Sequence, residues 1–379
     1  MQWNSIDALL VLLLSLFGII QLFYYIFFFA RLAFHKRVKP IDANPQIPVS
    51  IIICAKNEEA NLKKNLSKWF NQQYHKNGFP FYEIIVVNDN SEDDTFYFLQ
   101  EQKKIYPNLH VVHLTQSAKL IPGKKFALSM GIKASKFEHL LLTDADCTPA
   151  SSSWLACMAH EFESQKEIVL GYGPYIKYKG WLNKKIRFET LHSAMQYLSF
   201  ALAKNPYMGV GRNLAYHKNL FISNKGFSSH HHIVSGDDDL FINQVATKRN
   251  TSIVIDPNSF MYSEPKQSNE YWRFQKKRHL STGKYYKTKH KVLLGLYAFS
   301  HFSFWVLLIP CLIFHAWWIV TLSIFSLRWF IQWIVFERCC TKLKEEDLIN
   351  YIWLFDIWLV AYYLQNVSTI FFKKQTTWK

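Results

Sequence analysis

The sequence predicts an α/β fold with a mostly parallel sheet, flanked by helices that cross a membrane. Apolar runs such as SIIICA at 50–55 and YEIIVVND at 82–89 alternate with polar, helix-like stretches, which is typical of buried parallel strands with covering helices. Much longer apolar runs lie near both ends of the chain. Each is long enough to cross a hydrocarbon layer of about 30 Å.

Composition narrows the classes of partner. Half of the 379 residues are apolar, and 44 Lys and Arg outweigh 28 Asp and Glu, for a net charge of +16. This mixture fits a chain that meets lipid and an anionic partner, which charge alone does not identify among nucleic acid, an anionic membrane surface and a nucleotide diphosphate. Because the basic residues cluster at the edges of the apolar runs, we expect no nucleic acid.

Residues 1–34 are predicted to form a transmembrane anchor. The run from 8 to 33 is interrupted only by Gln21 and Arg31, and it lacks the basic leader and small-residue cleavage site of a signal peptide. Basic residues follow it, whereas the preceding tail carries Asp7 and no Lys or Arg. The positive-inside rule then places the next domain in the cytoplasm, and we expect an integral protein of the bacterial inner membrane.

Residues 48–291 are predicted to form the cytoplasmic α/β domain. Further expected elements are strands at 110–114 and 139–144 and helices at 125–133 and 152–163. The six cysteines show no regular spacing, so we expect them reduced, with neither a disulfide frame nor structural zinc.

Residues 292–336 are predicted to form a transmembrane helical hairpin, from the runs 292–313 and 316–336. A third run, 348–372, contains Asp356, Gln365 and Asn366. If it spans, the closing lysines fall outside, against the charge rule, so a helix in the interface or packed on the domain stays open.

Polar residues follow the first two predicted strands. Asn57 and Glu58 come after the first, and Asp89 ends the second. Ligands of open α/β sheets sit beyond the carboxyl ends of the strands, so Asp89 is a candidate to accept hydrogen bonds from a nucleotide base or ribose. For Ser91 to Thr95 we favour helix capping.

The third strand ends in Asp144-Ala145-Asp146. Two carboxylates this close suit a divalent cation such as Mg²⁺, which takes one or two carboxylates and leaves other positions to water and phosphates. Two surface aspartates in a loop are the alternative. Lys124, at the start of a predicted helix, is a candidate to neutralise phosphate, or a solvated lysine.

Three consecutive acids, Asp237, Asp238 and Asp239, stand at a predicted helix start, where carboxylates suit the helix dipole. Adjacent anions also repel one another, so partial burial raises a pKa, which is how a general base is made. The run His230 to His232 is interpreted as a loop rather than a metal site.

Taken in order, the segments KNEE, VNDNSEDDT, PGKKFAL, DAD, GRN, GDDD and QKKRH resemble the processive-type, family 2 inverting glycosyltransferases with a GT-A fold. The resemblance covers roughly 48–291 and implies a nucleotide pocket with Asp89 on the base and Asn57 and Glu58 beside it. It maps the family's metal motif, which binds Mg²⁺ or Mn²⁺, onto Asp144 and Asp146, with Asp146 the usual ligand.

The resemblance also assigns Asp237 as the catalytic base. Gly236 stands where the family often has Glu, so Asp238 is a second candidate. The family's QxxRW motif, at the acceptor channel and near the donor diphosphate, maps onto Gln275 and Arg278. His279 replaces its Trp, which weakens the case for a stacking platform and for long-chain processivity.

These expectations amount to a membrane-bound hexosyl- or N-acetylhexosaminyltransferase. It would move a sugar from a nucleotide-diphosphate sugar to a lipid-linked or polysaccharide acceptor. The alternative is an inactive transport or scaffold subunit with a transferase-like domain. Retention of Asp89, Asp144, Asp146 and Asp237 argues against it, since such a role does not need them together.

Overall fold

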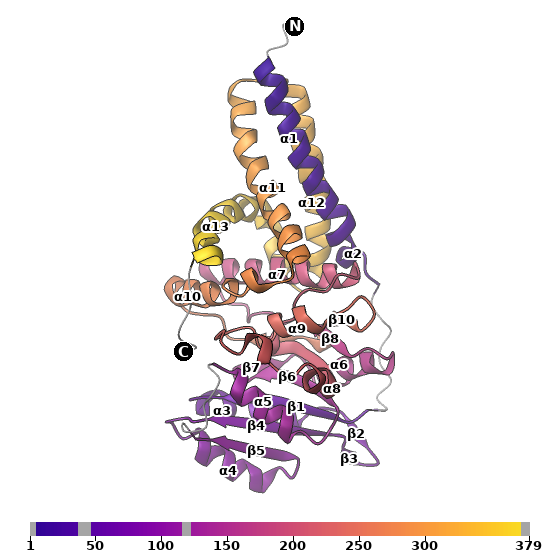
Figure 1. Cartoon of the computed structure of the whole chain (residues 1–379), viewed down its shortest axis with the longest axis vertical. Helices are drawn as coiled ribbons and strands as arrows, with labels where there is room; N and C mark the ends of the chain where they lie inside the picture. Colours follow the sequence, from indigo (N-terminus) through magenta and orange to yellow (C-terminus); the bar gives the residue numbers. More distant parts are fainter. Residues whose placement is uncertain (1–4, 37–46, 116–122, 373–379) are drawn as a thin grey trace.

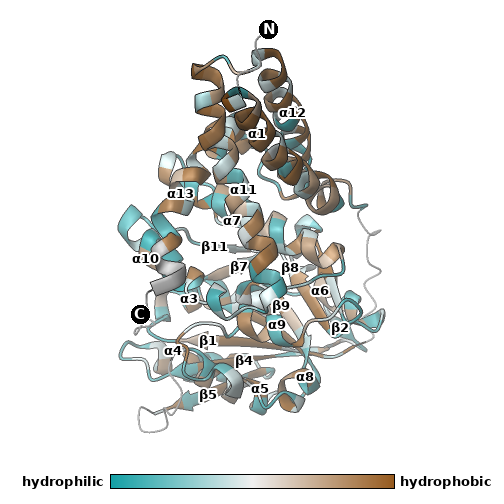
Figure 2. Ribbon diagram, turned by 45° about the horizontal axis from the view of Figure 1, so that its top comes forward, coloured by the Kyte–Doolittle hydropathy of each residue, from teal (hydrophilic) through white to brown (hydrophobic). Residues whose placement is uncertain are grey.

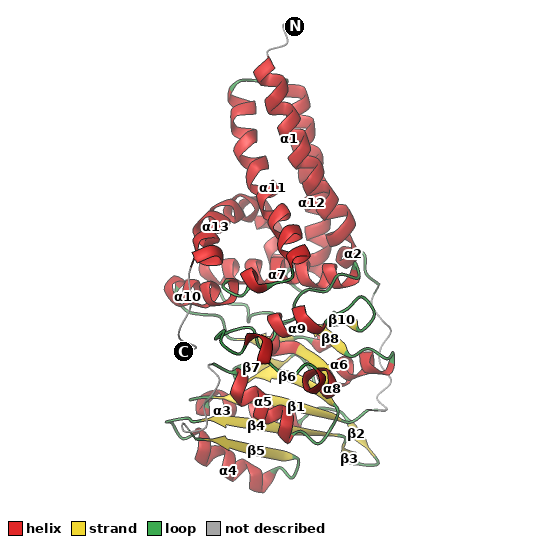
Figure 3. Ribbon diagram, viewed as in Figure 1, coloured by secondary structure: helices red, strands yellow, loops and turns green. Residues whose placement is uncertain are grey.

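A computed structural model describes residues 5–36, 47–115 and 123–372, with the side chains of 368–372 left aside (Figure 1). Figure 3 shows a strand-rich part joined to a helical part. The strands are β1 Val49–Ala55, β2 His75–Lys76, β3 Phe79–Pro80, β4 Tyr82–Asp89, β5 Leu109–Leu114, β6 His139–Asp144, β7 Cys147–Pro149, β8 Ile168–Gly171, β9 Leu214–His217, β10 Thr251–Val254 and β11 Met261–Ser263. The α-helices are α1 Ser5–Phe23, α2 Ala30–Ala33, α3 Glu59–Phe70, α4 Thr95–Ile105, α5 Lys125–Ala134, α6 Trp154–Glu163, α7 Trp181–Leu202, α8 Lys218–Ser223, α9 Asp239–Val245, α10 Asn269–Leu280, α11 Thr288–Ile313, α12 Trp318–Lys342 and α13 Ile352–Phe372.

The central sheet has seven strands in the order β10-β8-β9-β6-β1-β4-β5. Its neighbours pair in parallel except β9, which is antiparallel to both β6 and β8. The small pairs β2-β3 and β7-β11 stand apart from it. The predicted mostly parallel α/β sheet is therefore confirmed.

The strand β1 shows why the sheet is buried on both faces. All seven of its residues are buried, as its unbroken apolar sequence requires. Successive side chains point to opposite faces, so Ile52 joins the core under α5 and α7, whereas Ile51 and Ile53 join the core under α3 and α6. This two-sided packing fixes the carboxyl ends of β1, β4 and β6 at one edge.

Three helical segments are long and apolar enough to cross a membrane: Ser5–Ala33, α11 and α12. They form the apolar bundle that projects from the sheet-bearing part (Figures 1 and 2). Gln21, the polar interruption in the first segment, is buried and donates from Nε2 to Ser300 Oγ at 2.6 Å and to Tyr297 O at 3.1 Å on α11. Such bonds tie apolar helices together where lipid offers no alternative partner.

The first membrane segment changes from an α-helix to a π-helix where it meets the rest of the protein. Residues Tyr24–Phe29 form a π-helical turn between α1 and α2. Phe28 stacks on Phe200 of α7 with the ring centroids 4.3 Å apart. The turn therefore anchors the first segment to α7, which lies with α10 between the sheet and the bundle (Figure 1).

The last helix, α13, is less apolar and is not among the three candidate spans of the described chain. It packs against α10 and α11. Asp356 of α13 is buried and accepts from Arg328 Nη1 of α12 at 3.0 Å and from Gln332 Nε2 at 2.6 Å. A buried ion pair thus holds α13 to the bundle, and the membrane position predicted for 348–372 stays open.

Candidate active site

A cavity of about 1910 Å³ begins at the carboxyl ends of β1 and β6 and continues past α10 to α11 and α13. Its lining brings together eight of the residues singled out from the sequence: Glu58, Lys124, Asp144, Asp146, Asp237, Asp238, Gln275 and Arg278. They come from positions more than 200 residues apart in the chain. The predicted site is therefore a spatial cluster in this fold.

Two predicted nucleotide-binding residues lie outside this lining. Asp89 is buried at the end of β4, at the same sheet edge as Asp144. Asn57 has φ +54°. It connects the loop after β1 to the loop after β4, because its Oδ1 accepts from Glu92 N at 2.8 Å and its backbone N–H donates to Ser91 Oγ at 2.9 Å. Their roles toward a nucleotide stay predictions.

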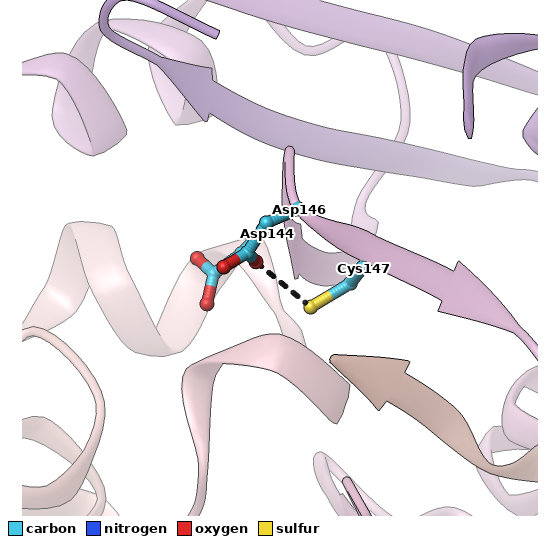
Figure 4. A group of neighbouring side chains, drawn as sticks. All are labelled: Asp144, Asp146 and Cys147. Carbon is cyan, nitrogen blue, oxygen red and sulfur yellow. Dashed lines mark hydrogen bonds between the residues drawn. The ribbon is translucent and has the colours of Figure 1, made fainter. Parts of the chain in front are cut away.

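The pair Asp144 and Asp146 forms a compact acidic group with Cys147 (Figure 4). One ligand atom from each of the three residues lies within 4.8 Å of the others. Cys147 is buried, which raises the pKa of its thiol, and its Sγ–H donates to Asp146 Oδ1 at 3.3 Å. A protonated thiol is a poor ligand for a hard cation, so we interpret Cys147 as a partner that orients Asp146.

The two carboxylates differ in their surroundings. Burial, followed by the nearby charge of Asp144, raises the pKa of Asp146. Burial also opposes ionisation of Asp144, but its ion pair with Lys124 and the nearby charges of Arg212 and Arg278 outweigh this and lower its pKa. A divalent cation on these oxygens would favour both ionised forms, so the residues fit an oxygen-liganded ion.

Arg212 belongs to this cluster, although the sequence analysis left it without a role of its own. It lines the cavity, and its guanidinium lies 4.4 Å from the centre of the Tyr175 ring. It packs so closely on Gly173 that a Cβ there would meet Arg212 Nε at 2.4 Å. The sequence signal that could have found this residue was the GRN segment at 211–213. This segment places the guanidinium of Arg212 near Asp144.

The three consecutive acids are held in different ways. Asp238 accepts from Gly211 N and Asp239 N, each at 2.7 Å, and so caps α9. Asp239 accepts from Thr282 and, at 2.7 Å, from Tyr286 OH, in the segment that leads into α11. All three acids line the cavity, and these hydrogen bonds engage the carboxylates of Asp238 and Asp239.

Burial, together with the charges of Asp237 and Asp239, raises the pKa of Asp238 to about 7. That value suits a general base, but both of its oxygens already serve backbone N–H groups. Gly236 has φ +98°, a conformation that residues with a side chain rarely adopt, so a glutamate at this position would be strained.

A buried lysine holds the loop that carries these acids. Lys125 Nζ donates to the carbonyl oxygens of His230 and Ile233, each at 2.7 Å. His230 Nε2 lies 3.0 Å from Gly236 O, so it supports the same loop. The histidine run was interpreted as a loop, and these contacts agree with that interpretation.

The helix α10 forms a basic wall of the cavity. Gln275, Arg278 and His279 all line it. His279 is exposed at the cavity wall, and the surrounding protein, followed by the charges of Arg278 and Lys276, lowers the pKa of its ring. Arg278 therefore supplies charge toward Asp144, and His279 supplies a neutral ring.

Comparison with known proteins agrees with this architecture. Residues 50–223 match the family model for glycosyl transferase family 2. A mannosyltransferase from Pyrobaculum calidifontis, solved in complex with GDP-Man and Mn²⁺, superposes with a TM-score of 0.59 over 95% of this chain and 98% of that one, at 16% identity. Residues 50–223 are thus similar to glycosyl transferase family 2, and the chain has the fold of the solved mannosyltransferase, which is the GT-A fold expected from the sequence.

Curated relatives match over shorter stretches. A beta-monoglucosyldiacylglycerol synthase of Trichormus variabilis is 38% identical over 107 residues, which is 28% of this chain and 22% of that protein. A poly-beta-1,6-N-acetyl-D-glucosamine synthase of Staphylococcus epidermidis is 29% identical over 134 residues, 35% of this chain and 30% of that protein. The chain thus matches less than a third of either relative's length.

Proposed function

We propose that this protein is a membrane-embedded, metal-dependent, inverting glycosyltransferase that moves a sugar from a nucleotide-diphosphate sugar to an acceptor at the membrane. One observation carries the proposal. A single cavity holds a two-carboxylate site, the cations Lys124, Arg212 and Arg278, and the acid Asp237. These are the groups that diphosphate binding and deprotonation of an acceptor require.

In this mechanism, Asp237 takes the proton of an acceptor hydroxyl. The acceptor oxygen then bonds to the anomeric carbon of the donor sugar, and the bond from that carbon to the diphosphate breaks. The electron pair leaves with the diphosphate, whose negative charge Arg212 and Arg278 stabilise. Attack from the face opposite the leaving group gives an inverted product.

Asp146 and Asp144 would hold Mg²⁺ or Mn²⁺, with Asp146 the principal ligand. When bound, the ion neutralises charge on the diphosphate. Lys124 pairs with Asp144 and keeps that carboxylate ionised. We also propose that Asp89, with Asn57 and Glu58, forms the nucleotide end of the site, and that Gln275 contacts the donor or acceptor from α10.

The topology follows from the charge rule. We infer that the first span leaves the N-terminus outside and the domain at 48–291 in the cytoplasm, with α11 and α12 as the returning hairpin. This places the cavity against the inner membrane surface. Relatives named for a glycolipid and for a polysaccharide are consistent with an acceptor of either kind.

Release of nucleoside diphosphate tests the proposal directly. The detergent-purified protein would be given a panel of nucleotide sugars with a membrane lipid extract, with Mn²⁺, Mg²⁺ or chelator. We expect one donor to turn over with metal. We expect Asp146→Ala to lower kcat/KM at least about a hundredfold, because the diphosphate loses its bound cation. Glu101→Gln, on an exposed face of α4, is the matched control and should keep the wild-type rate.

Turnover that is unchanged in chelator and in Asp146→Ala would contradict a metal-dependent mechanism. Absence of turnover across the whole donor panel, with the protein folded by its melting curve, would favour the inactive scaffold.

A further inference from the structure

The cavity extends well beyond the catalytic acids. Its volume of about 1910 Å³ is roughly twice the upper end for a pocket that encloses one small molecule. Past α10, its lining includes Leu294, Ala298 and Phe302 of α11 and Leu364 and Val367 of α13. The character of the wall therefore changes from charged to apolar along its length.

The middle of the cavity carries balanced charge. Glu189 of α7 pairs with Lys276 of α10, and both are buried. Tyr362 of α13 lies with its hydroxyl 3.5 Å from Glu189 Oε1. Glu189 thus balances the charge of Lys276, while Arg273, Lys277 and Arg278 keep the basic wall of α10 on the same cavity.

The apolar end opens within the membrane bundle. Phe299 lines the cavity and is 58% exposed, and Leu364 and Val367 across from it are 57% and 47% exposed. These residues lie on α11, a candidate span, and on α13, which packs against it. The apolar end thus lies between a candidate span and a helix that packs on it, and with α11 in the membrane an apolar ligand would reach it from the hydrocarbon layer.

We propose that this apolar end binds the hydrocarbon tails of a diacylglycerol-like membrane lipid whose free hydroxyl is the sugar acceptor. The inference rests on the proposed function and names its acceptor class. Continuity of one cavity from Asp237 to Phe299 lets a head group reach the acids while the tails stay among apolar side chains. The base also favours a hydroxyl, since a lipid phosphate is ionised already and needs no deprotonation.

A glycan chain fits this end less well. Sugar polymers are bound through hydroxyl hydrogen bonds and stacked aromatic rings. Here the lining is mostly aliphatic and Phe side chains, Leu294, Ala298, Phe299, Phe302, Leu364 and Val367, and its side-chain hydrogen-bonding groups come from Tyr362, Tyr363 and Asn366. A soluble acceptor has no apolar group that would fill the apolar end of the cavity.

Gly295 offers a way to close this end without disturbing the fold. A Cβ built there meets nothing within 4 Å, so Gly295→Trp places its ring in the cavity rather than against a neighbour. Replacing a helical glycine also favours the helix. Leu296→Trp is the matched control, because Leu296 is the adjacent residue of α11, is 39% exposed and lies outside the cavity lining.

The test is photocrosslinking with the full chain in phosphatidylcholine nanodiscs. The probe is a diacylglycerol that carries a diazirine in one acyl tail, and labelled peptides are mapped by mass spectrometry. We expect labelling at 294–302 and 364–367 that excess dioleoylglycerol removes and a polyprenyl phosphate does not. In Gly295→Trp, labelling should be about tenfold lower, and in Leu296→Trp unchanged.

Three results would overturn the inference: labelling spread equally over the outward positions Val306 and Ile309, labelling unchanged in Gly295→Trp, or competition by the polyprenyl phosphate alone. Because binding is measured without turnover, the outcome is separate from that of the proposed function. Competed labelling of a protein that turns over no donor would leave the lipid site standing and remove the transferase.

Discussion

The three consecutive aspartates before α9 differ because their hydrogen bonds differ. Asp238 accepts hydrogen bonds from the backbone N–H groups of two segments, and Asp239 accepts hydrogen bonds from the segment that leads into α11. Asp237 is the member that lines the cavity with neither duty. Three identical residues therefore have different hydrogen-bonding roles, which their order in the sequence does not reveal, and we propose the chemical role for Asp237.

The substitution Asp237→Asn should lower kcat by about 10² to 10⁴, because general-base assistance of that size is lost. Donor affinity should stay unchanged, as measured by titration of the protein with the active nucleotide sugar. Wild-type turnover in Asp237→Asn, together with loss in Asp238→Asn, would move the base to Asp238.

The raised pKa of Asp238 predicts a pH dependence of stability. Its folded-state pKa of about 7 exceeds the ordinary value of an aspartate, so the folded protein binds more protons between these two values. The free energy of unfolding contributed by this group must then fall as pH rises from about 4 to 7, by at most about 1.4 kcal/mol per pH unit. Thermal melting at several pH values should show a weaker decline in Asp238→Asn than in the wild type, and equal slopes would refute this.

At the scale of elements, two adjacent lysines at the start of α5 make different contacts. Lys124 reaches Asp144 in the cavity, whereas Lys125 is buried and holds the loop at 230–236. Gly123 precedes them with φ +75°, and a Cβ there would lie 2.3 Å from Val234 O. The glycine of the PGKKFAL segment is thus what lets this loop pack on the helix start, although Pro122 lies outside the described residues.

The substitution Lys125→Met should destabilise the protein by about 1–3 kcal/mol for each buried carbonyl left without its donor. It should also lower kcat more than donor affinity, since the loop that carries Asp237 loses its support. Melting curves and steady-state kinetics measure the two effects. Lys133→Met, at an exposed position of the same helix, is the control, and equal effects in both variants would contradict the bracing role.

The sequence predicted those elements whose pattern is local. Strands β1, β4, β5 and β6 and helices α5 and α6 lie where their apolar runs were found, because buried parallel strands read as unbroken apolar stretches. No element was predicted between 164 and 234, where α7 lies. Its residues are buried on nearly all sides, between the sheet and the bundle, so no single apolar stripe marks the helix.

At the scale of the whole molecule, the buried pair of Arg328 and Asp356 joins α12 to α13. Removing one partner leaves an uncompensated buried charge, so Arg328→Met or Asp356→Leu should each cost about 3–5 kcal/mol. The double variant Arg328→Met with Asp356→Leu should recover much of this. Melting in detergent measures the series, with the exposed Arg338→Met of α12 as control. A double variant as unstable as the sum of the singles would contradict a pairwise interaction.

Single residues of the site could be predicted from the sequence more readily than the contacts that bring them together. Asp144, Asp146 and Arg278 were found because each follows a recognisable segment. The contacts of Arg212 and Lys125 depend on long-range packing that no local pattern encodes. The same holds for the contact of α13 with the bundle, because the partner of Asp356 is Arg328 of α12, 28 residues earlier in the chain.

The bonds from Thr282 and Tyr286 to Asp239 bear on how this protein can be reused. They belong to the segment that enters α11, so the acidic loop is fastened to the root of a membrane helix. A fragment cut before α11 would keep the sheet and lose both this fastening and one wall of the cavity. A fusion of the sheet-bearing domain to a different membrane anchor would therefore need to include α11 and α13. Residues of these two helices line the same cavity as the acidic residues of the domain.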